Sequence, residues 1–64
     1  MNTTTKLWLS ELYKEEIRIT QIALKQNKRN IKNYDGLSPN PIEQTITDLT
    51  EYLIILKDLL SNLL

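Results

Sequence analysis

The chain has 64 residues, neither cysteine nor histidine, and eight basic and eight acidic residues, so its net charge is zero. The lack of cysteine excludes disulfides and thiolate metal sites, and the lack of histidine removes the commonest transition-metal ligand and the usual general base near neutral pH. A chain this short buries little apolar surface by itself, so oligomerisation is the remaining way to complete a core.

The chain lacks the segments that are typical of export or membrane insertion. The opening Met-Asn-Thr-Thr-Thr-Lys has no apolar stretch like that of a signal peptide. The most apolar segment, residues 52–64, is interrupted by Lys57 and Asp58 and is shorter than the roughly 20 apolar residues that span a bilayer. We therefore expect a soluble, cytoplasmic protein that does not contact membranes. The abundance of Ile, Lys, Asn and Thr suits an AT-rich genome, such as that of a phage or mobile element.

A first helix is predicted over about residues 4–33. Thr3, Thr4 or Thr5 can each offer a capping hydroxyl, and no Gly or Pro follows before Gly36. At about 100° per residue, one face is polar and comprises Glu11, Lys14, Arg18, Gln21, Lys25 and Lys28. The apolar side chains spread over a wide opposite arc, which comprises Trp8, Leu9, Leu12, Tyr13, Ile17, Ile19, Ile22, Ala23 and Leu24. This arc is wider than one partner helix can cover.

The end of this first helix is basic. Helical spacings of three and four residues bring together a basic patch of Lys25, Lys28, Arg29 and Lys32. Residues 1–34 carry a net charge of +4 and residues 35–64 a net charge of −4. In one interpretation, the cations favour the negative end of the helix dipole and complement an acidic second helix. In the other, they bind the phosphates of a nucleic acid.

A turn is predicted over about residues 34–40. Gly36 suits the left-handed conformation that ends many helices. A connection this short favours an antiparallel arrangement of the helices on either side.

A second helix is predicted over about residues 41–63. Asn40 is a good N-cap, Pro41 fits the first helical position, and Glu43 sits three residues after the cap. Ser38-Pro39 offers a competing cap two residues earlier. Either cap starts the helix close to the same residue.

This second helix carries an unbroken apolar repeat at alternating intervals of four and three residues. Its members are Ile42, Ile46, Leu49, Leu53, Leu56, Leu60 and Leu63. Such a repeat is typical of a helix packed lengthwise against other helices. Tyr52 and Leu59 widen it on one side, whereas Ile54 lies almost opposite.

Both apolar arcs are too wide for one hairpin to bury. Burying a Leu or Ile contributes about 1.5–3 kcal/mol, so half a dozen exposed ones forfeit on the order of 10 kcal/mol, comparable to the whole stability of a small domain. We therefore predict an all-α fold, an antiparallel helical hairpin that homodimerises into a four-helix bundle. The expected oligomer seam joins Leu12 and Ile19 to the seven-residue repeat of the second helix. In the alternative, a different protein covers the two apolar arcs with helices of its own.

The chain contains no catalytic constellation. Ser-His and Cys-His arrangements cannot be built, and a single glycine cannot form a Gly-rich phosphate loop. Carboxylates at Glu11, Glu15 and Glu16 could pair around metals in a bundle, but the Glu-x-x-His motifs of such sites are missing. A solvated face with a salt bridge to Arg18 or Lys14 is the plainer interpretation. We expect no catalysis, cofactor, metal or small-molecule substrate.

These features favour a small non-catalytic regulator, adaptor or inhibitor that binds another protein as a helical-bundle dimer. Trp8 and Tyr13 either anchor that partner or close the end of the bundle, which is the plainer interpretation. The alternative is a nucleic-acid-binding regulator that uses the basic patch. A third possibility is a structural subunit of a larger helical assembly.

Overall fold

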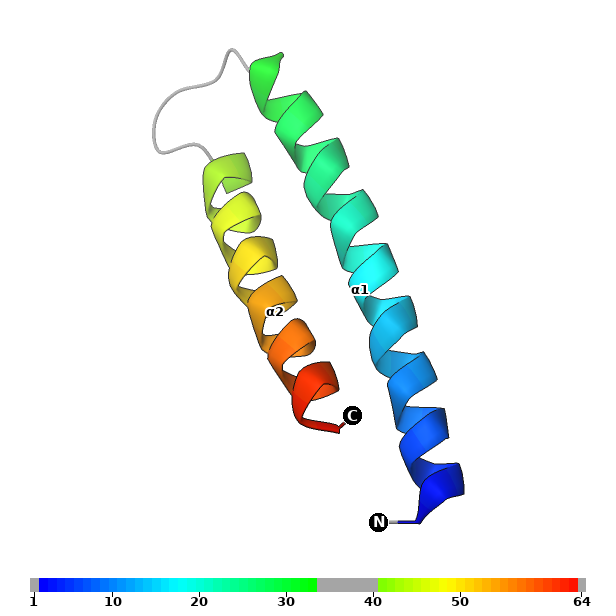
Figure 1. The fold of residues 1–64 in the computed structure, drawn as a ribbon. Helices are drawn as coiled ribbons and strands as arrows, with labels where there is room; N and C mark the ends of the chain where they lie inside the picture. Colours follow the sequence, from blue (N-terminus) through cyan, green and yellow to red (C-terminus); the bar gives the residue numbers. More distant parts are fainter. Residues whose placement is uncertain (1, 34–40, 64) are drawn as a thin grey trace.

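The computed structural model describes residues 2–33 and 41–63. These residues form two antiparallel α-helices, α1 (Thr3–Lys32) and α2 (Pro41–Leu63), that lie side by side as a hairpin (Figure 1). The predicted all-α hairpin is therefore confirmed. The predicted turn with Gly36 lies outside the described residues, and so do the predicted cap residues Ser38 and Asn40.

Helix α1 begins with a different cap from the one that we expected. Asn2 has an extended backbone, and its side-chain Oδ1 accepts a hydrogen bond of 2.8 Å from the backbone N–H of Thr5. The expectation that a threonine of the run 3–5 supplies the cap is therefore wrong. Asn is among the strongest N-cap residues because its short side chain reaches the free N–H groups of the first turn. The three threonines consequently lie inside the helix.

Helix α2 packs its apolar repeat against α1. Among the described residues of α2, the side chains that are buried or half-buried are the seven members of that repeat. Leu56 is only 4% exposed, whereas Ile54 on the opposite side is 57% exposed. This orientation follows from the spacing, because residues four and three apart fall on one side of a helix.

The face of α1 that contacts α2 is partly polar. It follows a 4-3 repeat of buried and half-buried residues: Ser10, Tyr13, Ile17, Thr20, Leu24, Asn27 and Ile31. Ser10 and Thr20 are each 3% exposed. The Thr20 hydroxyl donates a 2.7 Å hydrogen bond to the carbonyl of Glu16. The Asn27 amide likewise donates to the carbonyl of Ala23 over 2.8 Å, so α1 satisfies these polar groups itself.

The hairpin is thin. It measures 51 × 15 × 11 Å, and its radius of gyration is 15.2 Å, against about 11 Å for a compact domain of this length. Leu56 is the only buried apolar side chain among the described residues. The core is thus a single line of contact between α1 and α2, and most apolar side chains keep one side in solvent.

Candidate interaction surfaces

One long side of the hairpin carries large exposed apolar side chains and is called the apolar face here. Its members are Trp8, Leu12, Ile19 and Ile22 of α1 together with Tyr52, Ile55 and Leu59 of α2. They are between 40% and 61% exposed. Intervals of three, four and seven residues place each set in one stripe along its helix.

A hydrogen bond between the helices shows that both stripes lie on the same side of the hairpin. The Tyr52 hydroxyl donates to Oε1 of Glu16 over 3.1 Å. Along α1, Glu16 lies one turn from Leu12 and one turn from Ile19, and Tyr52 belongs to the stripe of α2. The stripe of α2 and the near edge of the α1 stripe, at Leu12 and Ile19, therefore lie on the same side of the hairpin.

The Tyr52–Glu16 pair is the polar centre of the apolar face. The hydrogen bond to the Glu16 carboxylate raises the pKa of Tyr52 above its usual 10.0, and desolvation and the carboxylate charge act in the same direction. Glu16 is half-buried, whereas Tyr52 is 40% exposed. Any partner that covers the apolar face must also accommodate this pair.

The residues of the predicted oligomer seam fall on two different surfaces. Those of α2 face α1 inside the hairpin: Ile42, Ile46, Leu49, Leu53, Leu56, Leu60 and Leu63. Leu12 and Ile19 are instead each 47% exposed on the apolar face. Trp8, which we expected to close the end of a bundle, is 61% exposed in the hairpin, and Tyr13 is half-buried in the contact face. A second copy can therefore reach Leu12, Ile19 and Trp8 without opening the hairpin.

The sequence-based expectations did not include the Tyr52–Glu16 hydrogen bond. One signal for this surface is present in the sequence. Helix α1 holds a second 4-3 pattern, offset from its contact face: Trp8, Leu12, Glu15, Ile19, Ile22 and Gln26. Two parallel patterns on one helix indicate two packing partners.

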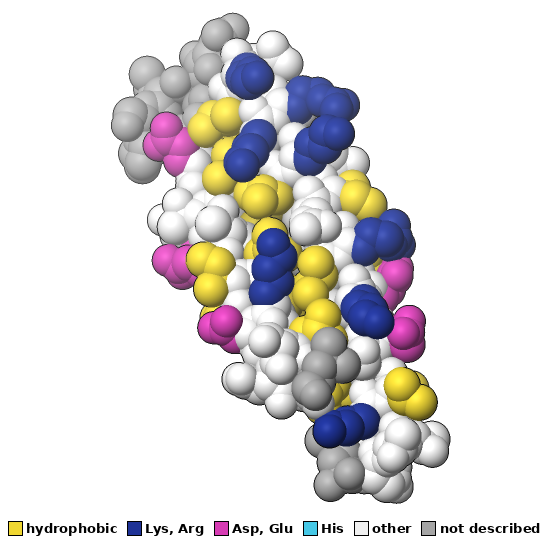
Figure 2. All heavy atoms as spheres, in the orientation of Figure 1, with side chains coloured by type: hydrophobic (Ala, Val, Ile, Leu, Met, Phe, Trp, Pro, Cys, Tyr) yellow, Lys and Arg dark blue, Asp and Glu magenta, His cyan; other side chains and the backbone are white. Residues whose placement is uncertain are grey.

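Cations gather on a second surface. Figure 2 shows Lys and Arg side chains along α1, with acidic side chains toward the edges of the molecule. Lys14 Nζ lies 3.6 Å from Glu11 Oε1, and Arg18 forms an ion pair with Glu15. The hydrogen bonds in the second pair lower the pKa of Glu15 and raise that of Arg18. These two cations are therefore already engaged within α1.

The basic patch of Lys25, Lys28, Arg29 and Lys32 differs from these engaged cations. All four side chains are exposed, and none forms an ion pair with a residue in the ranges 2–33 and 41–63. At about 100° per residue, the patch is centred roughly 115° around α1 from the stripe of the apolar face. A partner seated on the apolar face would therefore leave the patch accessible.

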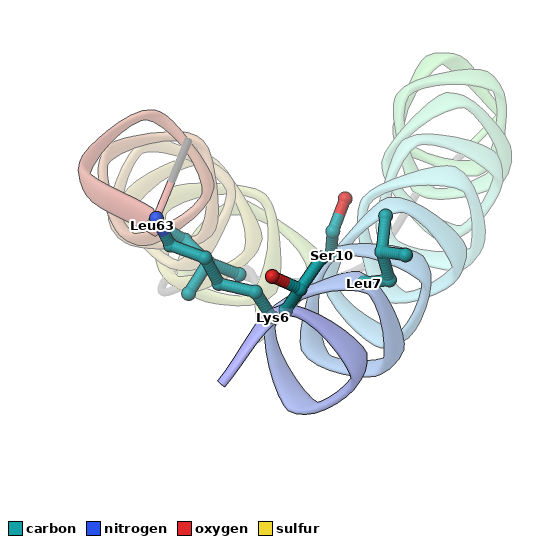
Figure 3. Close-up of a pocket in the computed structure, with 5 residues that line it drawn as sticks. Lys6, Leu7, Ser10 and Leu63 are labelled. Atoms are coloured by element: carbon teal, nitrogen blue, oxygen red, sulfur yellow. The ribbon is translucent and has the colours of Figure 1, made fainter. Parts of the chain in front are cut away.

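A shallow cavity of about 130 Å³ lies at the end of the hairpin where α1 begins and α2 ends. Thr3, Lys6, Leu7 and Ser10 of α1 line it together with Leu63 of α2. Figure 3 shows Lys6 extending from α1 toward Leu63. The cavity has room for about one side chain, and Lys6 is the only titratable side chain in its lining.

The helices offer no further feature that identifies a chemistry. Within residues 2–33 and 41–63, no group of three or more carboxylates is placed to hold a metal ion, and neither described helix is long and apolar enough to cross a membrane. Comparisons of the chain with protein-family models, with curated proteins and with solved structures gave no match. The apolar face and the basic patch are therefore the features that bear on function.

Proposed function

We propose that this chain is a small non-catalytic protein-binding regulator, adaptor or inhibitor, and that its working form is a homodimer. The apolar faces of two copies would pack together as a four-helix bundle. The observation that supports this is the apolar face itself, whose large side chains stay exposed while Ser10 and Thr20 occupy the contact with α2. A hairpin that worked alone would gain stability by turning its larger apolar side chains inward. A two-fold axis is the simplest way for one face to cover itself.

The accessible area supports the same proposal. The hairpin exposes 5059 Å², whereas a compact monomer of 7.5 kDa exposes about 4200 Å². The excess of about 800 Å² matches the area that each partner contributes to a standard protein interface. An interface of standard size with one second copy would therefore remove the excess area of each hairpin.

A partner protein would then bind the outer side of the dimer. Ile54 is 57% exposed on the side of α2 that faces away from α1. Thr47 and Thr50 precede it on the same side of α2, and each donates its hydroxyl to a backbone carbonyl one turn earlier. This small apolar patch stays outside the proposed interface, so it is where we place the contact with the partner.

Substitutions at two neighbouring isoleucines test whether the apolar face forms the dimer interface. Ile55 in the apolar face and Ile54 outside it are 54% and 57% exposed, so they differ in position rather than in burial. At tens of micromolar, light scattering should give twice the chain mass of 7.5 kDa for the wild type and for Ile54→Asp. Ile55→Asp should give the chain mass or lose its helical circular dichroism.

Alanine variants of the same two isoleucines distinguish loss of the dimer from loss of the folded helices. Alanine preserves helix propensity, so Ile55→Ala should weaken the dimer by at least about tenfold while the helices persist. Ile54→Ala should leave the dimer unchanged. A wild-type protein with the chain mass contradicts the proposed dimer. Equal effects of the two positions would show that a different face is used.

We propose nucleic-acid binding as the second candidate function. It is favoured by the basic patch, whose cations are exposed and form no ion pair within the described residues. A dimer presents at most eight such cations, so raising the salt from roughly 50 to 200 mM should weaken binding by about three to four orders of magnitude. Replacing Lys28 and Arg29 with Ala should abolish binding and preserve the dimer. If duplex DNA and RNA do not bind even at low salt, this candidate fails.

A further inference from the structure

The Tyr52–Glu16 pair occupies the part of the hairpin that a four-helix bundle would enclose most deeply. On α1, Glu16 lies between the face that contacts α2 and the stripe that belongs to the apolar face. Tyr52 has the corresponding place on α2, and the 3.1 Å hydrogen bond joins the two across the hairpin. Side chains between the two contact faces of a bundle helix point toward the central axis. A second copy on the apolar face would therefore enclose both groups.

Other charged groups near this pair have hydrogen-bond partners of their own on the same helix. On α1, Glu15 is exposed and hydrogen-bonded to Arg18. On α2, Asp48 is exposed and accepts a 2.9 Å hydrogen bond from Nε2 of Gln44. Glu16 is half-buried, and none of the ion pairs among the described residues includes it. Its carboxylate is therefore a negative charge that has no ion pair among the described residues and that a second copy would bury.

We propose that Glu16 and Tyr52 of two copies form the polar layer of the dimer core. This inference rests on the proposed dimer, and the occupant is a second copy because the excess exposed area matches one side of a dimer interface. Burying an ionised carboxylate is far less favourable than burying a protonated one. Two Glu16 carboxylates brought into one layer would also repel each other when both are ionised. Removing the charge of Glu16 should therefore strengthen the dimer.

The same polar layer would align the two copies. If one hairpin slid by a turn along the other, Glu16 would face apolar side chains and lose the polar surroundings that stabilise it. A single polar position in a helical core is known to select one alignment in this way. The pair would thus sacrifice some dimer affinity in return for a unique arrangement.

The substitution Glu16→Gln separates charge from hydrogen bonding. Glutamine keeps the shape of the side chain and an oxygen that can accept the Tyr52 hydroxyl, but it carries no charge to bury. At pH 7, we expect Glu16→Gln to dimerise at least about tenfold more tightly than the wild type in sedimentation equilibrium.

Glu11→Gln is the matched control, because it changes the net charge equally at an exposed position outside the apolar face. It should leave the dimer affinity at pH 7 unchanged. If both variants tighten the dimer equally, or if Glu16→Gln does not tighten it, the inference is overturned while the proposed dimer stands. A wild-type chain and a Glu16→Gln variant that both stay monomeric would overturn both. Circular dichroism of each variant excludes loss of the helices as the cause.

Discussion

The two packing faces of α1 differ in the opposite way from what burial of apolar side chains predicts, because the more polar face is the buried one. The face against α2 buries Ser10 and Thr20 to 3% exposure, whereas the neighbouring stripe leaves Trp8 and Ile19 exposed at 61% and 47%. Both faces have 4-3 spacing, so helix geometry alone does not choose between them. The smaller side chains give the leucines of α2 room to approach the α1 backbone closely, whereas larger ones would hold the helices apart.

This difference indicates that the hairpin is one half of a larger packed unit. The compact, internally hydrogen-bonded face closes the contact within the chain, where Thr20 satisfies its hydroxyl on the carbonyl of Glu16. The bulky face remains for a contact between chains. Substitutions that change one face at a time test whether the two faces have these separate roles.

The largest effect is expected from placing a charge in the contact within the chain. Leu56 is 4% exposed, so Leu56→Asp buries an unpaired carboxylate and should destabilise the protein by more than about 3 kcal/mol. Urea unfolding followed by circular dichroism measures the loss. Ile54→Asp, on the opposite side of α2, should change stability by less than about 1 kcal/mol. Similar losses from both variants would mean that α2 does not present its repeat to α1.

A smaller effect is expected from enlarging the polar contact face. Thr20→Leu adds volume at a position that is 3% exposed, and overpacking should cost about 1–3 kcal/mol in the same unfolding assay. Ile19→Leu is the control, because it exchanges residues of equal volume on the neighbouring exposed stripe of α1. A gain in stability from Thr20→Leu would show that the contact face merely lacks apolar bulk, and the comparison between the faces would fail.

The sequence predicts α2 better than α1 for a physical reason. On α2 one repeat of Ile and Leu dominates, so burial leaves a single orientation, and the structure has it. On α1 the apolar arc is wide, and polar Ser10 and Thr20 look like surface positions until the leucines opposite them are known. The cap at Asn2 depends on local geometry at a chain end, where a run of threonines offers close competitors.

The candidate site was harder to predict than the fold. Its stripes on the two helices are visible in the sequence, but their union into one surface depends on how the helices face each other. The hydrogen bond between Tyr52 and Glu16 joins residues 36 positions apart, and no local pattern specifies it. Helix spacing identifies which residues of one helix share a side, whereas a pairing between helices also requires their relative rotation and height.

The smallest expected effect is the titration of Tyr52, which tests whether the two helices meet as described. The hydrogen bond to Glu16 raises the pKa of Tyr52 above 10.0, so its contribution to stability is complete below pH 10 and is lost as the pH rises through the raised pKa. Replacing Tyr13 and Tyr34 with Phe leaves Tyr52 as the only tyrosine, and phenolate absorbance then follows its ionisation alone. Adding Glu16→Gln should return the pKa of Tyr52 toward 10.0, because the amide removes the negative charge that opposes ionisation. If Tyr52 titrates at 10.0 or below in both proteins, the pair is not formed in solution. The apolar face would then have no polar centre.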